Sequence, residues 1–285
     1  MKKILLTGSN GFIGNYFQDN YTDKYNIKTF SFRNDDFESL HVDDIDVVIH
    51  LSALVHQIGE LSKEKYEEIN VTQTVNLAKK AKASGVNHFI FMSTVKVYGE
   101  ESDIAYKNNS ICKPQDDYGK SKLKAEQGLK NLQNDNFKIS IIRTPIVYGY
   151  GVKGNMKKIV NLVKNTSILP LGKIKNRRSM VYVGNLCNII DILIVKERRG
   201  LFLASDDEVV STTFLIEQIS KTLNKSIYLI KVPFFTNILK LVKPTFYKRL
   251  YGNLEIDNRE TKKNLDFKNP YTTKEGIELM IKGKK

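Results

Sequence analysis

The sequence predicts an α/β fold, in which a doubly wound parallel sheet carries a smaller, discontinuous α/β lobe. Short apolar runs alternate with segments of helical periodicity through the first half of the chain. A glycine-rich turn directly follows the first apolar run, and the alternation stops after Gly149. We expect residues 1–149 with about 179–204 to form the main domain, and about 150–178 with 205–285 to form the smaller lobe.

Each element follows from its local pattern. Continuous apolar runs indicate strands buried on both faces, as in a parallel sheet, and apolar residues three or four positions apart indicate helices. Gly85 marks the expected end of one helix. The expected order is strand 3–7, helix 11–20, strands 27–32 and 46–51, helix 66–84, strand 88–93, helix 118–134, strand 138–143, helix 155–164, strand 179–183 and helix 184–194, with the last two rejoining the sheet.

Several of these strands end in residues suited to a site. Ligands of doubly wound sheets bind at the carboxyl ends of the strands, so these positions predict one common site. They are Gly8, Leu51, Ser52, Ala53, Ser93, Thr94, Thr144 and Pro145.

Composition narrows the range of partners and compartments. The net charge is +14, which suits anionic partners, although a compositional bias explains it equally well. No nucleic-acid motif accompanies the charge, so we expect no nucleic-acid partner. Cys112 and Cys187 lack paired spacing, so we expect neither a disulfide nor a metal site. With no signal peptide or membrane span in the sequence, we expect a cytoplasmic protein, and a homodimer stays open.

The glycine-rich turn predicts a dinucleotide site. Gly8, Gly11 and Gly14 stand between a strand and a helix, where glycines allow a tight turn and bring backbone N–H groups to a pyrophosphate. A purely structural turn is the alternative. The larger domain is therefore expected to be a Rossmann-type dinucleotide-binding domain, and the smaller lobe to bind substrate.

Tyr118 and Lys122 predict acid–base chemistry. Four residues apart on a helix, they share one face. A free phenol has a pKa near 10, and a neighbouring ammonium lowers it by stabilising the phenolate. Thr94, at the end of a strand, can hydrogen-bond the same substrate oxygen. Each feature alone is common, but their order along the chain favours a joint site.

Together these motifs resemble the extended short-chain dehydrogenase/reductase family, in its epimerase/dehydratase branch of nucleotide-sugar enzymes. The similar segments are Thr7–Gly14 (TGxxGxxG), His50–Ala53 (HLAA), Phe91–Gly99 (SS…VYG), Tyr118–Lys122 (YxxxK), Arg143–Gly149 (RPxxVYG) and Arg178–Val183 (RDxxHV). The resemblance implies that Thr94, Tyr118 and Lys122 are catalytic. The cofactor contacts it implies are Gly8, Gly11, Phe12, Ile13, Gly14, Leu51, Ser52, Ala53, Lys122 and Pro145.

Shorter segments resemble capsule and O-antigen enzymes that reduce or epimerise C4 of UDP-hexosamines. They are Ala53–His56, Ser93–Glu100 and Gly151–Asn155. The implied substrate is a UDP-sugar for surface polysaccharide synthesis. Its implied contacts are His56, Thr94, Lys96, Asn155, Arg178 and Arg249. The two arginines suit the diphosphate, with a structural ion pair as the alternative for each.

Two departures from the family pattern bear on the reaction. The second strand lacks the acidic residue that selects NAD, and Arg33 is placed to accept a 2′-phosphate, although a solvated loop cation is the alternative. Ile146 replaces a common substrate-contacting Asn. NADP(H) is therefore favoured over NAD(H). We expect NADPH-dependent reduction of the C4 ketone of a UDP-4-keto-6-deoxy-N-acetylhexosamine; the alternative is an NAD-dependent 4-epimerase of UDP-glucose or UDP-GlcNAc.

Residues 233–249 interleave apolar and basic side chains, as an interfacial helix does. We expect this segment to pack against its own domain, and peripheral membrane contact is the alternative. A catalytically silent relative of the fold is disfavoured, because Thr94, Tyr118 and Lys122 are all present.

Overall fold

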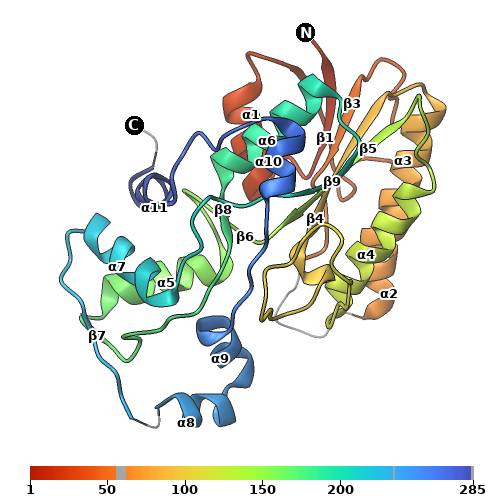
Figure 1. Cartoon of the computed structure of the whole chain (residues 1–285). Helices are drawn as coiled ribbons and strands as arrows, with labels where there is room; N and C mark the ends of the chain where they lie inside the picture. The colour runs from red at the N-terminus through yellow and green to blue at the C-terminus, as the bar shows by residue number, and fades with distance from the viewer. Residues whose placement is uncertain (56–61, 234, 284–285) are drawn as a thin grey trace.

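A computed structural model describes residues 1–55, 62–233 and 235–283. Its main sheet has six parallel strands in the order β2–β1–β3–β4–β5–β9 (Figure 1). They are β1 (Lys3–Thr7), β2 (Asn26–Phe30), β3 (Val47–His50), β4 (His88–Thr94), β5 (Lys138–Thr144) and β9 (Gly200–Leu203). The predicted doubly wound α/β fold is confirmed. The strand order reverses at β1 and β3, where such sheets bind ligands.

Helices cover both faces of the sheet because successive strand residues point to opposite sides. Ile4 and Leu6 of β1 join a core with α1 (Phe12–Tyr21) and α6 (Val183–Lys196). Leu5, between them, joins a second core with α3 (Gln73–Ala83) and α4 (Asp117–Lys130). Figure 1 shows α1 and α6 on one side of the sheet and α3 and α4 on the other. Apolar runs without alternation therefore identified β1, β3, β4 and β5, whereas β2 is largely exposed and β9 was not expected from the sequence.

The helix expected over residues 66–84 is interrupted. It consists of α2 (Lys63–Tyr66), a π-helical turn η1 (Glu67–Thr72) and α3. Asn70 in the π turn is fully buried, and its side chain hydrogen-bonds the backbone of Leu54 in both directions, at 2.8 and 3.0 Å. These bonds satisfy the backbone of a segment that leaves the sheet without pairing to another strand.

The strand expected at residues 179–183 does not rejoin the main sheet. β8 (Met180–Tyr182) pairs instead with β6 (Ile146–Tyr148) in a separate two-stranded sheet, and β9 takes the outer position beside β5. Pro145 lies between β5 and β6 and has no N–H to donate, so the chain leaves the sheet there and offers β8 a different partner.

The remaining elements belong mainly to the lower part of the molecule in Figure 1. The strands β7 (Ile168–Leu169) and β10 (Tyr228–Leu229) pair in parallel. The helices are α5 (Gly154–Asn165), α7 (Thr212–Thr222), α8 (Phe235–Val242), α9 (Pro244–Tyr251), α10 (Arg259–Leu265) and α11 (Thr273–Lys282). α10 contacts α6 and β9, whereas α11 contacts α7 and β8. The division into two lobes at the residues given above stays a prediction.

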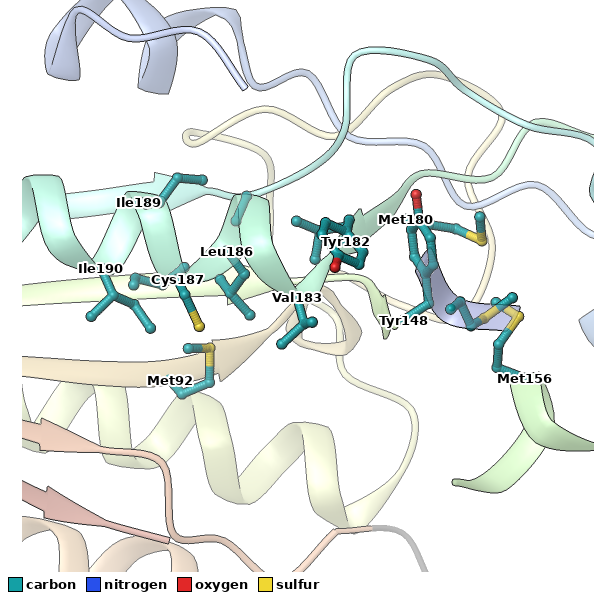
Figure 2. Packing of buried hydrophobic residues seen from close by; sticks show 14 of the residues in the cluster. Met92, Tyr148, Met156, Met180, Tyr182, Val183, Leu186, Cys187, Ile189 and Ile190 are labelled. Atoms are coloured by element: carbon teal, nitrogen blue, oxygen red, sulfur yellow. The ribbon is translucent and has the colours of Figure 1, made fainter. Parts of the chain in front are cut away.

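One continuous core extends from the main sheet to β6, β8, α5 and α7. Figure 2 shows Met92 of β4 facing Cys187 of α6, and Tyr148, Met156 and Met180 where β6, α5 and β8 meet. This shared packing fixes β6, β8, α5 and α7 in position relative to the main sheet. Within the described part of the chain, no helix is long and apolar enough to cross a membrane.

Candidate active site

Two elements bring the three predicted catalytic residues together. Thr94 is the last residue of β4, and Tyr118 and Lys122 lie one turn apart on α4. Asp116 caps this helix, since its Oδ1 accepts a hydrogen bond from the Gly119 N–H at 2.7 Å. The side chains of Thr94 and Tyr118 interact, and both residues line one pocket. A substrate oxygen at this pair would meet two hydroxyl groups.

The surroundings of Tyr118 favour its protonated form. Burial raises the pKa of Tyr118 above its ordinary value, and the negative charge of Asp116 raises it further, while the hydrogen bond with Thr94 acts in the opposite direction. The phenol is therefore a proton donor at neutral pH. To accept a proton, it needs positive charge beside it.

Lys122, one turn further along α4, is the cation that the sequence predicts to supply this charge. Burial lowers its pKa to about 7, and Glu126, one turn further along α4, opposes the shift. The Nζ atom lies 3.9 Å from the centroid of the Phe91 ring. Because this pKa is near neutral, modest changes in the surroundings of Lys122 change its charge.

Glu126 was not expected from the sequence, although its spacing four residues after Lys122 was available as a signal. Its buried carboxylate accepts two hydrogen bonds from Arg143, at 3.0 and 2.5 Å, and one from the Ser93 hydroxyl at 2.5 Å. The bidentate ion pair ties α4 to β5 and β4. The relative positions of Thr94 and Tyr118 depend on this tie.

The glycine-rich turn has the geometry of a phosphate cradle. Gly8 has φ +72°, and a Cβ there would lie 2.7 Å from the Ser52 nitrogen. A Cβ on Gly14 would lie 2.3 Å from the Gly8 carbonyl oxygen. No side chain among the described residues caps the start of α1, which follows Gly11. A dinucleotide pyrophosphate fits a helix N-terminus that has free donors and no side chains in the way.

A buried hydrogen-bonded chain connects this turn to α4. The Ser52 N–H donates to the Thr7 hydroxyl at 3.3 Å, and Thr7 bonds His50 Nδ1 at 2.7 Å. His50 Nε2 bonds Thr74 at 2.9 Å, and Thr74 donates to the Asn70 carbonyl at 2.8 Å.

This series of hydrogen bonds ends at α4. The Asn70 amide donates to the Ser121 hydroxyl at 2.9 Å, and Ser121 donates to the Tyr118 carbonyl at 2.8 Å. Burial, with the charge of Lys122, lowers the pKa of His50 to about 3. The imidazole is therefore neutral. Asn70 and Thr74 escaped the sequence prediction, because a polar residue inside a helix gives no sign of its partners.

Arg33 lies exposed in the turn after β2, near the edge of the glycine turn, since Phe30 pairs with Thr7. The sequence predicted no acid at this strand end. In the structure, however, the Asp35 carboxylate lies at the end of β2, because its Oδ2 accepts a hydrogen bond from the Ser31 N–H at 2.7 Å. Both an arginine and a carboxylate therefore lie in the turn that follows β2.

A pocket of about 510 Å³ extends from the Thr94–Tyr118 pair to α5, α7 and α9. It gathers seven residues predicted from the sequence: Thr94, Lys96, Tyr118, Pro145, Asn155, Arg178 and Arg249. Lys158 also lines it and was missed, although it stands one turn after Asn155 on α5. Leu51, Ser52 and Ala53 follow β3, and Ile13 lies in the first turn of α1. The predicted contact His56 lies outside the described residues.

Arg178 is held in the pocket wall without a carboxylate among its recorded hydrogen-bond partners. Nη1 donates to the carbonyl oxygens of Gly252 at 3.1 Å and Lys248 at 3.5 Å, and Nε has no hydrogen-bond partner within the described part of the chain. Burial lowers the pKa of Arg178, the negative charges of Glu100 and Glu101 oppose this shift, and the charge of Arg249 adds to it. A largely desolvated guanidinium with a spare donor suits an anionic ligand.

Lys96 is already engaged by the protein. Its Nζ lies 2.5 Å from Asp116 Oδ2 and 2.8 Å from Glu100 Oε1. Burial lowers the pKa of Lys96, but the hydrogen bonds to the two carboxylates outweigh burial and leave it raised. Through Asp116, Lys96 steadies the start of the helix that carries Tyr118.

Comparisons with known proteins agree with this geometry. The model of the NAD dependent epimerase/dehydratase family matches residues 4–201. The chain is similar to UDP-glucose 4-epimerase of Vibrio cholerae, at 37% identity over 97% of this chain and 93% of that protein. It is also similar to the N-acetyl-alpha-D-glucosaminyl-diphospho-ditrans,octacis-undecaprenol 4-epimerase of Escherichia coli O157:H7, at 26% identity over 81% of this chain and 75% of that one.

Solved structures share the fold. A dTDP-4-dehydrorhamnose reductase from Bacillus anthracis in complex with NADP gives a TM-score of 0.80 at 22% identity, over the whole of both chains. UDP-glucuronic acid 4-epimerase from Bacillus cereus in complex with NAD gives 0.78 at 19% identity, over 98% of this chain and 97% of that one. At this level of identity the likeness extends to the fold alone.

Proposed function

The chain belongs to the NAD dependent epimerase/dehydratase family and is an NAD(P)-dependent nucleotide-sugar enzyme, and within that class we propose that it is a 4-epimerase of a UDP-sugar. The observation that carries the proposal is one pocket holding both the Thr94–Tyr118 hydroxyl pair and the buried Arg178. The similarity to the Vibrio cholerae epimerase supports epimerisation over the ketone reduction expected from the sequence.

The cofactor of this family supplies a hydride acceptor and donor when it is bound. The glycine turn from Gly8 to Gly14 would hold its pyrophosphate. Lys122 would bind the nicotinamide ribose, and Pro145 would border the ring. Leu51, Ser52 and Ala53, at the carboxyl end of β3, would contact the same cofactor.

Tyr118 moves the proton at the C4 oxygen of the sugar. It accepts the hydroxyl proton while C4 is oxidised and returns that proton when the resulting ketone is reduced from its other face. The residue ends each turnover as it began, so the net reaction inverts C4 and consumes neither oxidant nor reductant. Thr94 holds the same oxygen in both directions, and a protonated Lys122 favours the phenolate.

The opposite end of the pocket would hold the UDP diphosphate. Arg178 offers a buried guanidinium, and Arg249 and Lys158 add positive charge from two other elements. Ile146 and Leu171 make part of the intervening wall apolar. A wall with few hydrogen-bonding groups leaves the sugar free to turn and present either face at C4.

The reaction can be tested with the purified protein, NAD⁺ and either UDP-glucose or UDP-GlcNAc, without a reductant. The proposal expects conversion to the C4 epimer until equilibrium, followed by NMR of the anomeric proton, with no net accumulation of NADH. If neither sugar is epimerised in the presence of saturating NAD⁺ or NADP⁺, the proposal is wrong.

A second candidate is the 4-ketoreductase, which Arg33 specifically favours. That reaction would use NADPH in proportion to a UDP-4-keto-6-deoxy-N-acetylhexosamine consumed, and Tyr118 would donate its proton to the C4 oxygen. Titration of both cofactors distinguishes the candidates. Tighter NADPH than NADH binding, lost in Arg33→Asp, would support the reductase, whereas equal or tighter NADH binding would support the epimerase.

A further inference from the structure

α8 exposes an apolar face that its own domain does not cover. None of its described residues is buried, and Ile238, Leu241 and Val242 are 61%, 85% and 66% exposed. Their spacing of three and four residues places them on one side of the helix. Phe235 and Leu239 pack inward against the core. The sequence predicted that residues 233–249 pack against their own domain. In α8, only the side that carries Phe235 and Leu239 does so.

Positive charge surrounds this face. Residues 231–254 contain five basic and no acidic residues. Lys240, Lys243 and Arg249 are exposed. Lys248 is partly neutralised, because its Nζ lies 3.5 Å from Glu101. Phe246 on α9, 48% exposed, adds an aromatic ring to the same pair of packed helices.

We propose that α8 and the start of α9 dock on an anionic phospholipid bilayer. Ile238, Leu241 and Val242 would enter the boundary between headgroups and acyl chains, while Lys240 and Lys243 bind lipid phosphates. A second copy of the chain is a poor occupant of this face. An isologous contact would set the same lysines against each other.

The position of α8 and α9 relates the proposed membrane contact to the substrate pocket. Figure 1 shows α8 at the end of the smaller lobe farthest from the N-terminus, next to α9. Phe246, Arg249 and Leu250 of α9 line the substrate pocket. Docking through α8 would therefore bring one wall of the pocket close to the bilayer surface.

Cosedimentation of the full chain with vesicles tests the proposal. We expect binding to an equal mixture of phosphatidylglycerol and phosphatidylcholine and little binding to phosphatidylcholine alone. The double variant Ile238→Ser with Leu241→Ser should bind the mixed vesicles about tenfold more weakly or worse. Ile104→Ser is the matched control, since Ile104 is also 80% exposed but lies outside these helices.

A second pair of variants separates charge from apolar insertion. Lys240→Gln and Lys243→Gln should each weaken vesicle binding about fivefold, and added salt should release the wild type. Circular dichroism and turnover of a soluble UDP-sugar should stay unchanged in all these variants. The proposal is overturned if the double serine variant binds as the wild type does. It is also overturned if sedimentation velocity shows a dimer that this variant abolishes.

Discussion

At the scale of the residue, burial acts on Tyr118 and Lys122 in opposite directions. It strengthens the hold of the phenol on its proton and weakens that of the ammonium. In water the two groups have similar pKa values, but here the lysine loses its proton first. A phenolate at Tyr118 is therefore favoured only while Lys122 keeps its proton.

Replacing Tyr118 by Phe removes the proton donor and keeps the ring. We expect kcat to fall by about 10²–10⁴, the range of general acid–base catalysis, with little change in UDP-sugar affinity. Turnover and isothermal titration calorimetry check the two parts. Tyr228→Phe, at an exposed position, is the control. Retention of more than half of the wild-type turnover would show that another group moves the proton.

Arg178 and its neighbour Arg177 offer a matched pair of substitutions. Arg178 lines the pocket, whereas Arg177 is exposed and pairs with Glu255 at 2.5 Å. Arg178→Ala should weaken the binding of UDP and of the UDP-sugar together by roughly ten- to a hundredfold, because both present the diphosphate. Arg177→Ala should leave both affinities near wild type. Equal effects of the two substitutions on UDP affinity would assign Arg178 a structural role.

At the scale of the element, apolar runs predicted the sheet strands well because both faces of a parallel strand must be buried. The same signal misplaced β8, since Val181 and its neighbours are buried equally well in a small separate sheet. The order of motifs along the chain also anticipated the pocket. The partners of Asn70 and Glu126 could not be predicted, because they come from residues distant in sequence.

β3 ends in a buried neutral histidine, which makes stability depend on pH. The pKa of His50 is lowered to about 3 from its ordinary 6.5. The unfolded chain therefore binds more protons below pH 6.5, and stability present above that pH is lost as the pH falls toward 3. The contribution is about 1.4 kcal/mol for each pH unit in this window.

We expect His50→Gln to reduce the dependence of the unfolding free energy on pH between about 6.5 and 4, measured by urea denaturation at several pH values. The exposed His41 supplies the control, and His41→Gln should keep the wild-type dependence. His88 is also buried, and its pKa is lowered to about 4, so part of the slope should persist. An unchanged slope in His50→Gln would mean that His50 is protonated in the folded state.

At the scale of the whole molecule, composition gives the net charge but does not show where in the fold the charged side chains lie. The net +14 is a sum over the chain. The structure adds that Arg178, Arg249 and Lys158 converge on one pocket, while other cations border α8. Both arrangements require contacts between segments far apart in sequence, which local patterns do not encode.

If this field draws in the substrate, kcat/KM for a dianionic UDP-sugar should fall as salt rises, because screening shortens the reach of exposed charge to about 8 Å at physiological ionic strength. Initial rates over a salt series check the effect. At saturating substrate, kcat serves as the internal control and should change far less. A kcat/KM independent of salt would show that encounter does not depend on the overall charge.

The π turn η1 holds one residue more than an α-helical turn, because its hydrogen bonds close over five residues and not four. Deleting a residue of η1 other than Asn70 would let these bonds return to the α pattern, so the helix would stay continuous into α3. The residues before the deletion would then each move one position along the helix. We therefore expect such a deletion to break the bonds that join Asn70 to Leu54 and Ser121 while the core contacts of α3 remain.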